Sequence, residues 1–217
     1  KIVELLDELP HEAQLIGAVN TVLNDNGKLI GYNTDGYGFM QSVRDAGHDI
    51  TGKNITVMGV GGASMAICAQ SALDGAASVH IFARRTSRYW NRTQKFAENL
   101  SAKTGCQVCL FDNDDHTALR DSIAQSYLLI NATSVGMVPD IDDTIIKDTS
   151  LFHPELVVAD VVYEPQETRL LREAKAAGCQ TFNGMYMLLH QGAKAFQIWT
   201  GQEMPVSVIK EKYFSVK

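Results

Sequence analysis

Short apolar runs rich in β-branched residues alternate with helical patterns along most of this chain, and this alternation limits its possible folds more than any other feature. Strands are expected at residues 55–60, 78–83, 107–111, 127–131 and 156–162, and helices at residues 63–73, 90–103 and 168–177. Strands that are apolar throughout are typical of a parallel sheet that is buried on both faces. We therefore predict an α/β fold with a doubly wound parallel sheet of the Rossmann type.

Two terminal pieces fall outside this pattern. An acidic helix is expected at about residues 2–9, and the apolar runs on either side of residues 24–27 (NDNG) predict a hairpin. Residues 185–200 (MYMLLHQGAKAFQIWT) predict a strongly apolar helix. The two pieces bracket the α/β unit and would suit a second lobe built from both ends of the chain.

Composition narrows the classes of function. The 217 residues carry 19 basic and 25 acidic side chains, a net charge of −6 that disfavours binding to a nucleic acid backbone. No apolar run approaches the roughly 20 residues needed to span a bilayer. The four cysteines are too few for a disulfide scaffold and indicate a reducing compartment, so we expect a cytoplasmic protein.

A glycine-rich turn, GVGGAS, lies where the first buried strand meets the first helix. Gly59 and Gly61 fit the G-x-G-x-x-G spacing of dinucleotide-binding turns, and Ser64 replaces the third glycine. Glycines allow the backbone to approach a pyrophosphate closely, and the helix start offers unpaired N–H groups and a positive dipole end. We therefore predict a dinucleotide site at Gly59, Gly61, Gly62, Ala63 and Ser64.

The end of the second strand normally distinguishes NAD from NADP. A carboxylate there accepts hydrogen bonds from the ribose 2′-hydroxyl of NAD, whereas basic side chains suit a 2′-phosphate. Here the strand runs into Arg84, Arg85 and Thr86 without a carboxylate. Arginine donors match a phosphate well, and the threonine can add a hydroxyl. We therefore predict NADP as the cofactor, while use of NAD stays open.

Six motifs occur in order along nearly the whole chain. They are GAVNT (residues 17–21), NTDG (33–36), GVGGAS (59–64), NATSVGM (131–137), DVVYEPQETRLL (160–171) and MLLHQGAKAFQIWTG (187–201). With this ordered set the sequence resembles the shikimate dehydrogenase family, in particular its quinate/shikimate dehydrogenase branch. Any one motif would be modest evidence, but the set is highly specific.

The resemblance implies roles for individual residues. Asn20 and Asp35 match the residues that hydrogen-bond the ring hydroxyls of the substrate, and Asp35 also matches the Asp of a catalytic Lys–Asp pair. Tyr163 and Gln191 match two further substrate-binding residues. The remaining matches lie beside the nicotinamide end of the cofactor: Thr133, Ser134, Val135, Met137 and Gly184.

The chemistry of alcohol oxidation requires both an acid/base residue and polar substrate-binding residues. Transfer of a hydride from a secondary alcohol to nicotinamide requires removal of the hydroxyl proton, so an acid/base group must lie within hydrogen-bond reach. A polyhydroxylated substrate also needs several directional polar groups to fix which carbon faces the cofactor. The reaction requires no metal. On local sequence alone, an Asx turn before a helix is another explanation for Asp35.

The sequence departs from the family pattern at several positions. Spacing to Asp7 puts the family's catalytic lysine about two residues before Lys1, so it and the first half of the substrate lobe are expected to lie outside this sequence. Ala83 stands where the family often has Asn, and Glu164 replaces another Asn. Tyr186 occupies a position usually held by Gly and could alter the placement of the nicotinamide.

The resemblance also divides the chain into three segments. We expect residues 1–35 to be a remnant of the substrate-binding lobe, residues 36–186 to form the Rossmann domain, and residues 187–217 to form helices that return to the substrate lobe.

Two other features that could suggest chemistry are expected to be ordinary packing. They are the pair Cys106 and Cys109 on a predicted strand and His190 on the apolar helix.

These observations predict an NADP-linked oxidoreductase that interconverts shikimate and 3-dehydroshikimate, a step in the synthesis of chorismate and the aromatic amino acids. One alternative is a quinate-preferring, NAD-dependent quinate/shikimate dehydrogenase. The other is a non-catalytic module that senses nucleotide or shikimate. The expected partner is a small-molecule substrate, without nucleic acid or membrane, in a monomer or homodimer.

Overall fold

A computed structural model describes residues 2–214 and contains a six-stranded sheet in which every pairing is parallel. Its strands are β3 (Asn54–Met58), β4 (Ser78–Ala83), β5 (Gln107–Asp112), β6 (Leu128–Asn131), β7 (Val157–Asp160) and β8 (Gln180–Phe182). They lie in the order β5-β4-β3-β6-β7-β8. Counted from β3, this is the 3-2-1-4-5-6 order of doubly wound dinucleotide-binding sheets, so the predicted fold class is confirmed.

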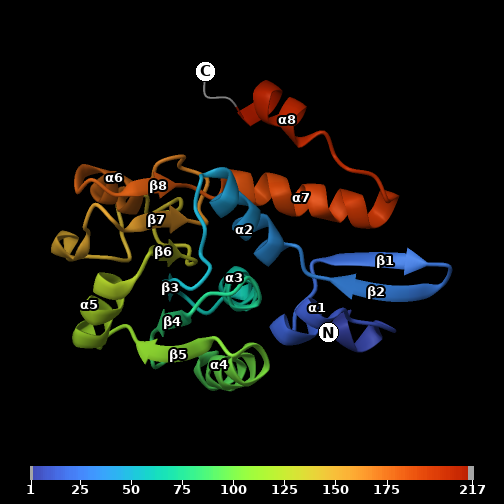
Figure 1. Cartoon of the computed structure of the whole chain (residues 1–217), viewed down its shortest axis with the longest axis horizontal. Helices are drawn as coiled ribbons and strands as arrows, with labels where there is room; N and C mark the ends of the chain where they lie inside the picture. The colour runs from blue at the N-terminus through green and yellow to red at the C-terminus, as the bar shows by residue number, and fades with distance from the viewer. Residues whose placement is uncertain (1, 215–217) are drawn as a thin grey trace.

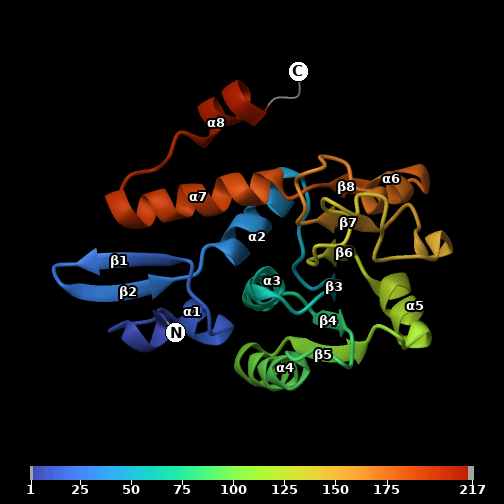
Figure 2. The same ribbon diagram turned by 180° about the vertical axis from the view of Figure 1, so that it is seen from behind.

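Helices cover both faces of the sheet (Figures 1 and 2). One face packs against α2 (Asp35–Asp45), α3 (Gly62–Leu73) and α4 (Trp90–Thr104), and the other against α5 (His116–Gln125) and α6 (Arg169–Ala176). Successive strand residues alternate between the two cores. Ile55 and Val57 belong to the first core and Met58 to the second. This two-sided burial explains why the strands are apolar throughout.

A separate hairpin joins β1 (Thr21–Asp25) to β2 (Lys28–Tyr32) through Asn26 and Gly27. Both turn residues have positive φ, 51° at Asn26 and 96° at Gly27. That backbone geometry favours Asn-Gly in two-residue hairpin turns, and it confirms the predicted hairpin. The Trp199 indole N–H of α7 (Met185–Thr200) donates to the Val22 carbonyl at 3.0 Å and so links the hairpin to the C-terminal helix.

The acidic helix expected at residues 2–9 is wrong. Only a short 3-10 turn, η1 (Ile2–Leu5), forms there, and the helix α1 (His11–Ile16) begins after Pro10. Asp7 instead pairs with the hairpin: its N–H donates to the Leu29 carbonyl at 2.9 Å, and its carboxylate accepts from the Leu29 N–H at 2.7 Å. These contacts between distant residues replace the local hydrogen bonds of a helix.

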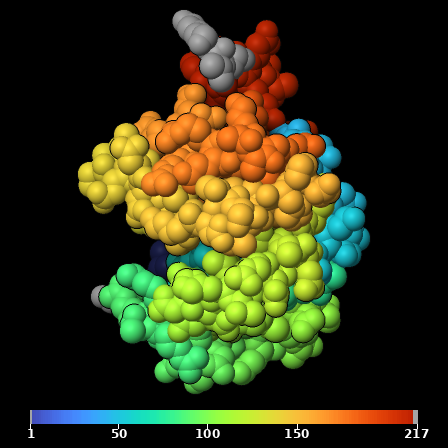
Figure 3. All heavy atoms as spheres, turned by 90° about the vertical axis from the view of Figure 1, so that its left-hand side faces the viewer, coloured from blue at the N-terminus to red at the C-terminus, as the bar shows by residue number. Residues whose placement is uncertain are grey.

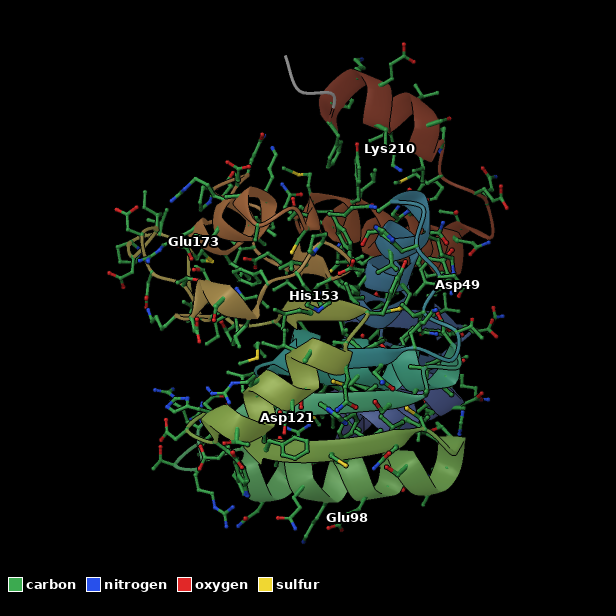
Figure 4. The ribbon with its side chains drawn as sticks, turned by 60° about the vertical axis from the view of Figure 1, so that its left-hand side comes forward. Asp49, Glu98, Asp121, His153, Glu173 and Lys210 are labelled. Atoms are coloured by element: carbon green, nitrogen blue, oxygen red, sulfur yellow. The ribbon has the colours of Figure 1, made fainter. Side chains whose placement is uncertain are left out.

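A 3-10 turn, η2 (Thr149–Leu151), precedes β7. After the turn at Gly201, the C-terminal segment crosses over α7 and forms α8 (Val206–Ile209) and η3 (Lys210–Phe214). Lys210 lies on this segment, above α7 (Figure 4). It pairs with Asp45 at the end of α2, and Asp45 also accepts from the His190 ring at 2.7 Å. None of the helices in residues 2–214 has the length and hydropathy to cross a membrane.

Candidate active site

A cavity of about 790 Å³ lies at the carboxyl ends of β3, β4 and β6. In Figure 3 a hollow separates the green segments that follow β4 from the yellow and orange segments that follow β6. The cavity sits where the strand order reverses between β3 and β6, which is where doubly wound sheets bind their ligands. Seven predicted cofactor residues line it: Gly59, Gly61, Arg84, Thr86, Thr133, Ser134 and Val135.

The glycine turn forms the floor of this cavity. Gly59 has φ +111°, and a Cβ there would lie 2.9 Å from both the Ala132 carbonyl oxygen and Thr133 Cγ2, so only glycine fits. Gly61 caps the start of α3, and a Cβ on Gly61 or Gly62 would meet nothing within 4 Å. Bare backbone at a helix start leaves room for a diphosphate on unpaired N–H groups.

Ser64 has a supporting place in this turn. Its side chain is fully buried, and its hydroxyl donates to the Gly59 carbonyl at 2.6 Å. Ala63 lies beside it in the first turn of α3. The serine that replaces the third glycine therefore braces the turn from inside.

The loop after β4 presents two arginines to the cavity, Arg84 and Arg88, together with Thr86 and Ser87. Arg85 lies outside the lining, and its guanidinium packs over the Trp90 ring at 4.9 Å from the centroid. The sequence predicts a cofactor contact at Arg85 and none at Arg88. The only sequence signal for Arg88 is its place in the same basic run, ARRTSR.

The residues of the cavity fit NADP. The described lining contains no Asp or Glu, so nothing there would repel a 2′-phosphate or favour the free 2′-hydroxyl of NAD. Arg84 and Arg88 are the groups that would hold that phosphate, and the α3 start would hold the diphosphate.

The loop after β6 is fixed by Asn131. Its side-chain oxygen Oδ1 accepts from the Thr133 hydroxyl at 2.6 Å and from the Thr133 N–H at 3.1 Å. Its side-chain nitrogen Nδ2 donates to the Val135 carbonyl at 3.1 Å. Thr133 and Val135 are thereby held against the cavity. Met137, further along this loop, is 48% exposed and outside the lining.

Asp160 continues this network beneath the cavity and was not among the predicted site residues. The carboxylate is fully buried and accepts from Asn131 at 3.0 Å, the Val162 N–H at 3.0 Å and the Thr168 hydroxyl at 2.8 Å. Burial raises the pKa of Asp160 to about 6, although these hydrogen bonds act in the opposite direction. Asp160 therefore joins the loop after β6 to the loop after β7.

A second polar cluster brings together three segments of the chain. Asn20, before β1, donates to Asp35 Oδ1 at 2.9 Å and to the Thr34 hydroxyl at 3.1 Å. The Thr34 hydroxyl lies 3.4 Å from Gln191 Oε1 on α7. Three of the four predicted substrate residues, Asn20, Asp35 and Gln191, therefore lie in one connected cluster.

Asp35 is the half-buried carboxylate of this cluster and the first residue of α2. Burial raises the pKa of Asp35 above its usual value, and the hydrogen bond from Asn20 opposes this shift. A carboxyl group with a raised pKa accepts and returns a proton closer to neutral pH.

Glycines allow α2 and α7 to approach closely enough to form the cluster. A Cβ on Gly38 would lie 2.7 Å from both the Gln191 N and the Met187 O, so a larger residue would separate the two helices. Gly184 serves the start of α7 in the same way, because a Cβ there would overlap the Val161 carbonyl oxygen. The predicted cofactor role of Gly184 remains a prediction, since this packing alone explains the glycine.

The sequence also singles out Tyr163 and Tyr186. Tyr163 is 40% exposed, and within residues 2–214 no hydrogen bond joins it to Asn20, Asp35 or Gln191. The Tyr186 ring faces the C-terminal segment, with its centroid 6.4 Å from that of Phe214 and 4.3 Å from Lys210 Nζ.

The expected packing roles agree with the structure. His190 is buried and paired with Asp45. Cys106 is buried just before β5, and burial raises the pKa of its thiol to about 11, whereas Cys109 within β5 is partly buried.

A dinucleotide cavity at the switch point of a Rossmann sheet, in a chain that also holds a carboxylate with a raised pKa among polar side chains, defines an NAD(P)-dependent oxidoreductase. Comparison with known proteins makes this class specific. The chain belongs to the shikimate dehydrogenase family.

Three relatives and one domain model support this assignment. Shikimate dehydrogenase (NADP(+)) of Listeria innocua is 52% identical over 209 residues, which cover 96% of this chain and 72% of the relative. Quinate/shikimate dehydrogenase of Escherichia coli is 42% identical over 208 residues, with the same shares of each chain. A crystal structure of Listeria monocytogenes shikimate 5-dehydrogenase with shikimate and NAD superposes with a TM-score of 0.94 at 50% identity, covering 97% of this chain and 73% of that one. Residues 184–212 match the Shikimate 5'-dehydrogenase C-terminal domain.

The comparisons confirm the resemblance drawn from the six motifs. They also decide between the functional classes considered from the sequence, because these relatives are dehydrogenases rather than non-catalytic sensors. NADP+ appears in the name of one relative and NAD in the complex of another, in agreement with the cofactors expected.

Proposed function

We propose that this chain catalyses the NADP-linked interconversion of shikimate and 3-dehydroshikimate, with Asp35 as the acid/base residue. One observation carries the proposal: Asp35, a carboxyl with a raised pKa, is joined to Asn20 and, through Thr34, to Gln191. A substrate with several ring hydroxyls needs polar groups of this kind from more than one direction.

The chemistry follows from the cluster. NADP+, when bound, supplies the hydride acceptor at its nicotinamide ring. As the C–H bond of the alcohol carbon breaks, Asp35 accepts or relays the hydroxyl proton, and the C–O bond becomes a carbonyl. Asn20 and Gln191 would hold neighbouring hydroxyls, with Tyr163 as a further proposed contact. Together they would fix which carbon faces the cofactor.

The proposed cofactor contacts use both ends of the cavity. Gly61, Gly62 and Ala63 would hold the diphosphate on the start of α3. Arg84 and Arg88, with Thr86, would hold the 2′-phosphate. Thr133, Ser134, Val135 and Met137 would border the nicotinamide end.

The decisive experiment compares shikimate-dependent reduction of NADP+ by the longest natural form of the protein with that of its Asp35→Asn variant. We expect kcat/KM to fall by roughly 10²- to 10⁴-fold, while the Kd for NADP+ stays unchanged. Asp49→Asn, on the connection after α2 (labelled in Figure 4), is the matched control and should keep full activity. Unchanged turnover in the Asp35 variant would contradict the proposal.

Quinate and NAD+ form the second candidate pair of reactants. The 42% identical relative is a quinate/shikimate dehydrogenase, and a quinate dehydrogenase of Corynebacterium glutamicum solved with NAD superposes at a TM-score of 0.86 with 33% identity. The same assay, run with quinate and with NAD+, ranks the two substrates and cofactors by kcat/KM.

The division of the chain and its setting are also proposals. We propose that residues 1–35 and 187–217 serve the substrate lobe, that residues 36–186 form the cofactor domain, and that the protein acts in the cytoplasm as a monomer or homodimer. Light scattering of the purified protein gives its oligomeric state directly.

A further inference from the structure

Asn113 lines the cofactor cavity immediately after β5. Its backbone N–H donates to the Ala83 carbonyl at 2.9 Å, which fixes the residue against the end of β4. Its side-chain oxygen Oδ1 is buried, yet no group within residues 2–214 donates a hydrogen bond to it. In this part of the chain only one other buried side-chain atom, Glu173 Oε2, shares that condition, and Glu173 lies on α6, away from the cavity.

A buried acceptor without a donor costs free energy, so such groups in a binding cavity indicate a donor on the ligand. A dinucleotide offers few donors at its adenosine end. They are the ribose hydroxyls and the 6-amino group of adenine, since an ionised phosphate only accepts.

The position of Asn113 selects between these donors. Arg84 and Arg88 follow β4 and would hold the phosphorylated ribose, whereas Asn113 follows β5, one strand further from the glycine turn on β3. Ile145, which is partly buried, lines the same cavity and offers an apolar contact for a base. The glycine turn after β3 suits a diphosphate, and the arginines after β4 suit a ribose phosphate. The next position in this order, after β5, is where the base would lie.

We propose that Asn113 makes the cavity selective for adenine, with Oδ1 accepting from the 6-amino group. The side-chain amide group can at the same time donate to an adjacent ring nitrogen, as in the usual pairing of Asn with adenine. This inference rests on the proposed binding of NADP in this cavity.

The test measures dissociation constants for NADP+ and for its hypoxanthine analogue, in which a carbonyl oxygen replaces the 6-amino group. The wild-type protein should bind NADP+ roughly 10-fold more tightly, because the analogue sets two acceptors against each other. Asn113→Leu removes the acceptor, so the ratio of the two constants should fall to within about twofold of unity. Asn113→Asp keeps an acceptor and should keep the preference for adenine.

Asp114→Leu is the matched control, because Asp114 is exposed on the same loop and outside the lining. It should leave the ratio unchanged. The inference is overturned if the wild-type protein binds both dinucleotides equally, or if Asn113→Leu keeps the wild-type ratio. A wild-type protein that binds neither dinucleotide would contradict the proposed function itself, and with it this inference.

Discussion

At the scale of single residues, two arginines in the loop after β4 take different places relative to the cavity. Arg85 and Arg88 belong to one basic run and each packs over an aromatic ring. Arg88, which donates to the Tyr89 hydroxyl at 2.6 Å, lines the cavity together with Tyr89, whereas Arg85 packs over Trp90 outside the lining. A sequence specifies that arginines follow the strand. It does not specify which of them a turn directs toward the ligand, because that depends on the path of the backbone.

The pair gives a prediction with its own control. Arg88→Ala should weaken binding of NADP+ by roughly 10-fold relative to NAD+, because a charge-assisted contact to the 2′-phosphate is lost. Arg85→Ala should change the ratio of the two dissociation constants by less than about twofold. Titration of both cofactors into each variant checks this, and equal losses in the two variants would count against the assignment.

Asp160 predicts a pH dependence of stability. Its pKa is raised to about 6 in the folded protein, above the unfolded value, so the folded state binds an extra proton between these values. This contribution to stability is complete below the unfolded pKa and is lost as the pH rises through about 6. Between pH 5 and 7.5 the wild-type free energy of unfolding should therefore fall by roughly 1 kcal/mol more than that of Asp160→Asn. Urea unfolding of both proteins at the two pH values measures the difference, and parallel pH profiles would contradict it.

At the scale of elements, the close approach of α2 and α7 creates the substrate cluster. Gly38→Ala places a methyl group against the backbone of Met187 and Gln191, which should lower the free energy of unfolding by roughly 1–3 kcal/mol and raise the KM for shikimate. Gly192→Ala, on the same α7, meets nothing within 4 Å and should be neutral or stabilising by up to about 1 kcal/mol. Denaturation and initial rates of the two variants test this, and similar behaviour would show that the helix contact does not position Gln191.

The elements also show what can be predicted from sequence. β4 and α7 begin and end where their hydrophobic patterns predict, because the sheet and the helices bury those patterns directly. The expected helix at residues 2–9 fails because Asp7 pairs with Leu29, 22 positions along the chain, and no local pattern records such a contact. The cluster of Asn20, Asp35 and Gln191 was expected only through the family resemblance, since the three residues share no local motif.

At the scale of the whole molecule, Asp45 ties the C-terminal segment to the body of the protein through Lys210, while it also holds His190. Burial raises the pKa of Asp45, but hydrogen bonds from Lys210 and His190 outweigh this effect and lower it overall. The stabilisation from these pairs is therefore present above the unfolded pKa and is lost as the pH falls through the lowered value.

We expect Asp45→Asn to loosen this attachment. Amide hydrogen exchange in residues 206–214 should then be faster than in the wild-type protein at pH 7, while exchange in β3 and β6 stays unchanged. Asp49→Asn is the control and should leave both regions as they are. Unaltered exchange at residues 206–214 in the Asp45 variant would show that other contacts hold the segment.

The loop after β4 and the substrate cluster come from separate parts of the chain. Arg84, Thr86 and Arg88 lie on one short connection. Asn20, Asp35 and Gln191 are spread over three segments, which hydrogen bonds and the close approach of α2 and α7 at Gly38 hold together. Mutations in that single connection can therefore change the preferred cofactor while the substrate stays the same. In evolutionary terms, the choice of electron carrier can drift among descendants of one ancestral enzyme without loss of its place in metabolism.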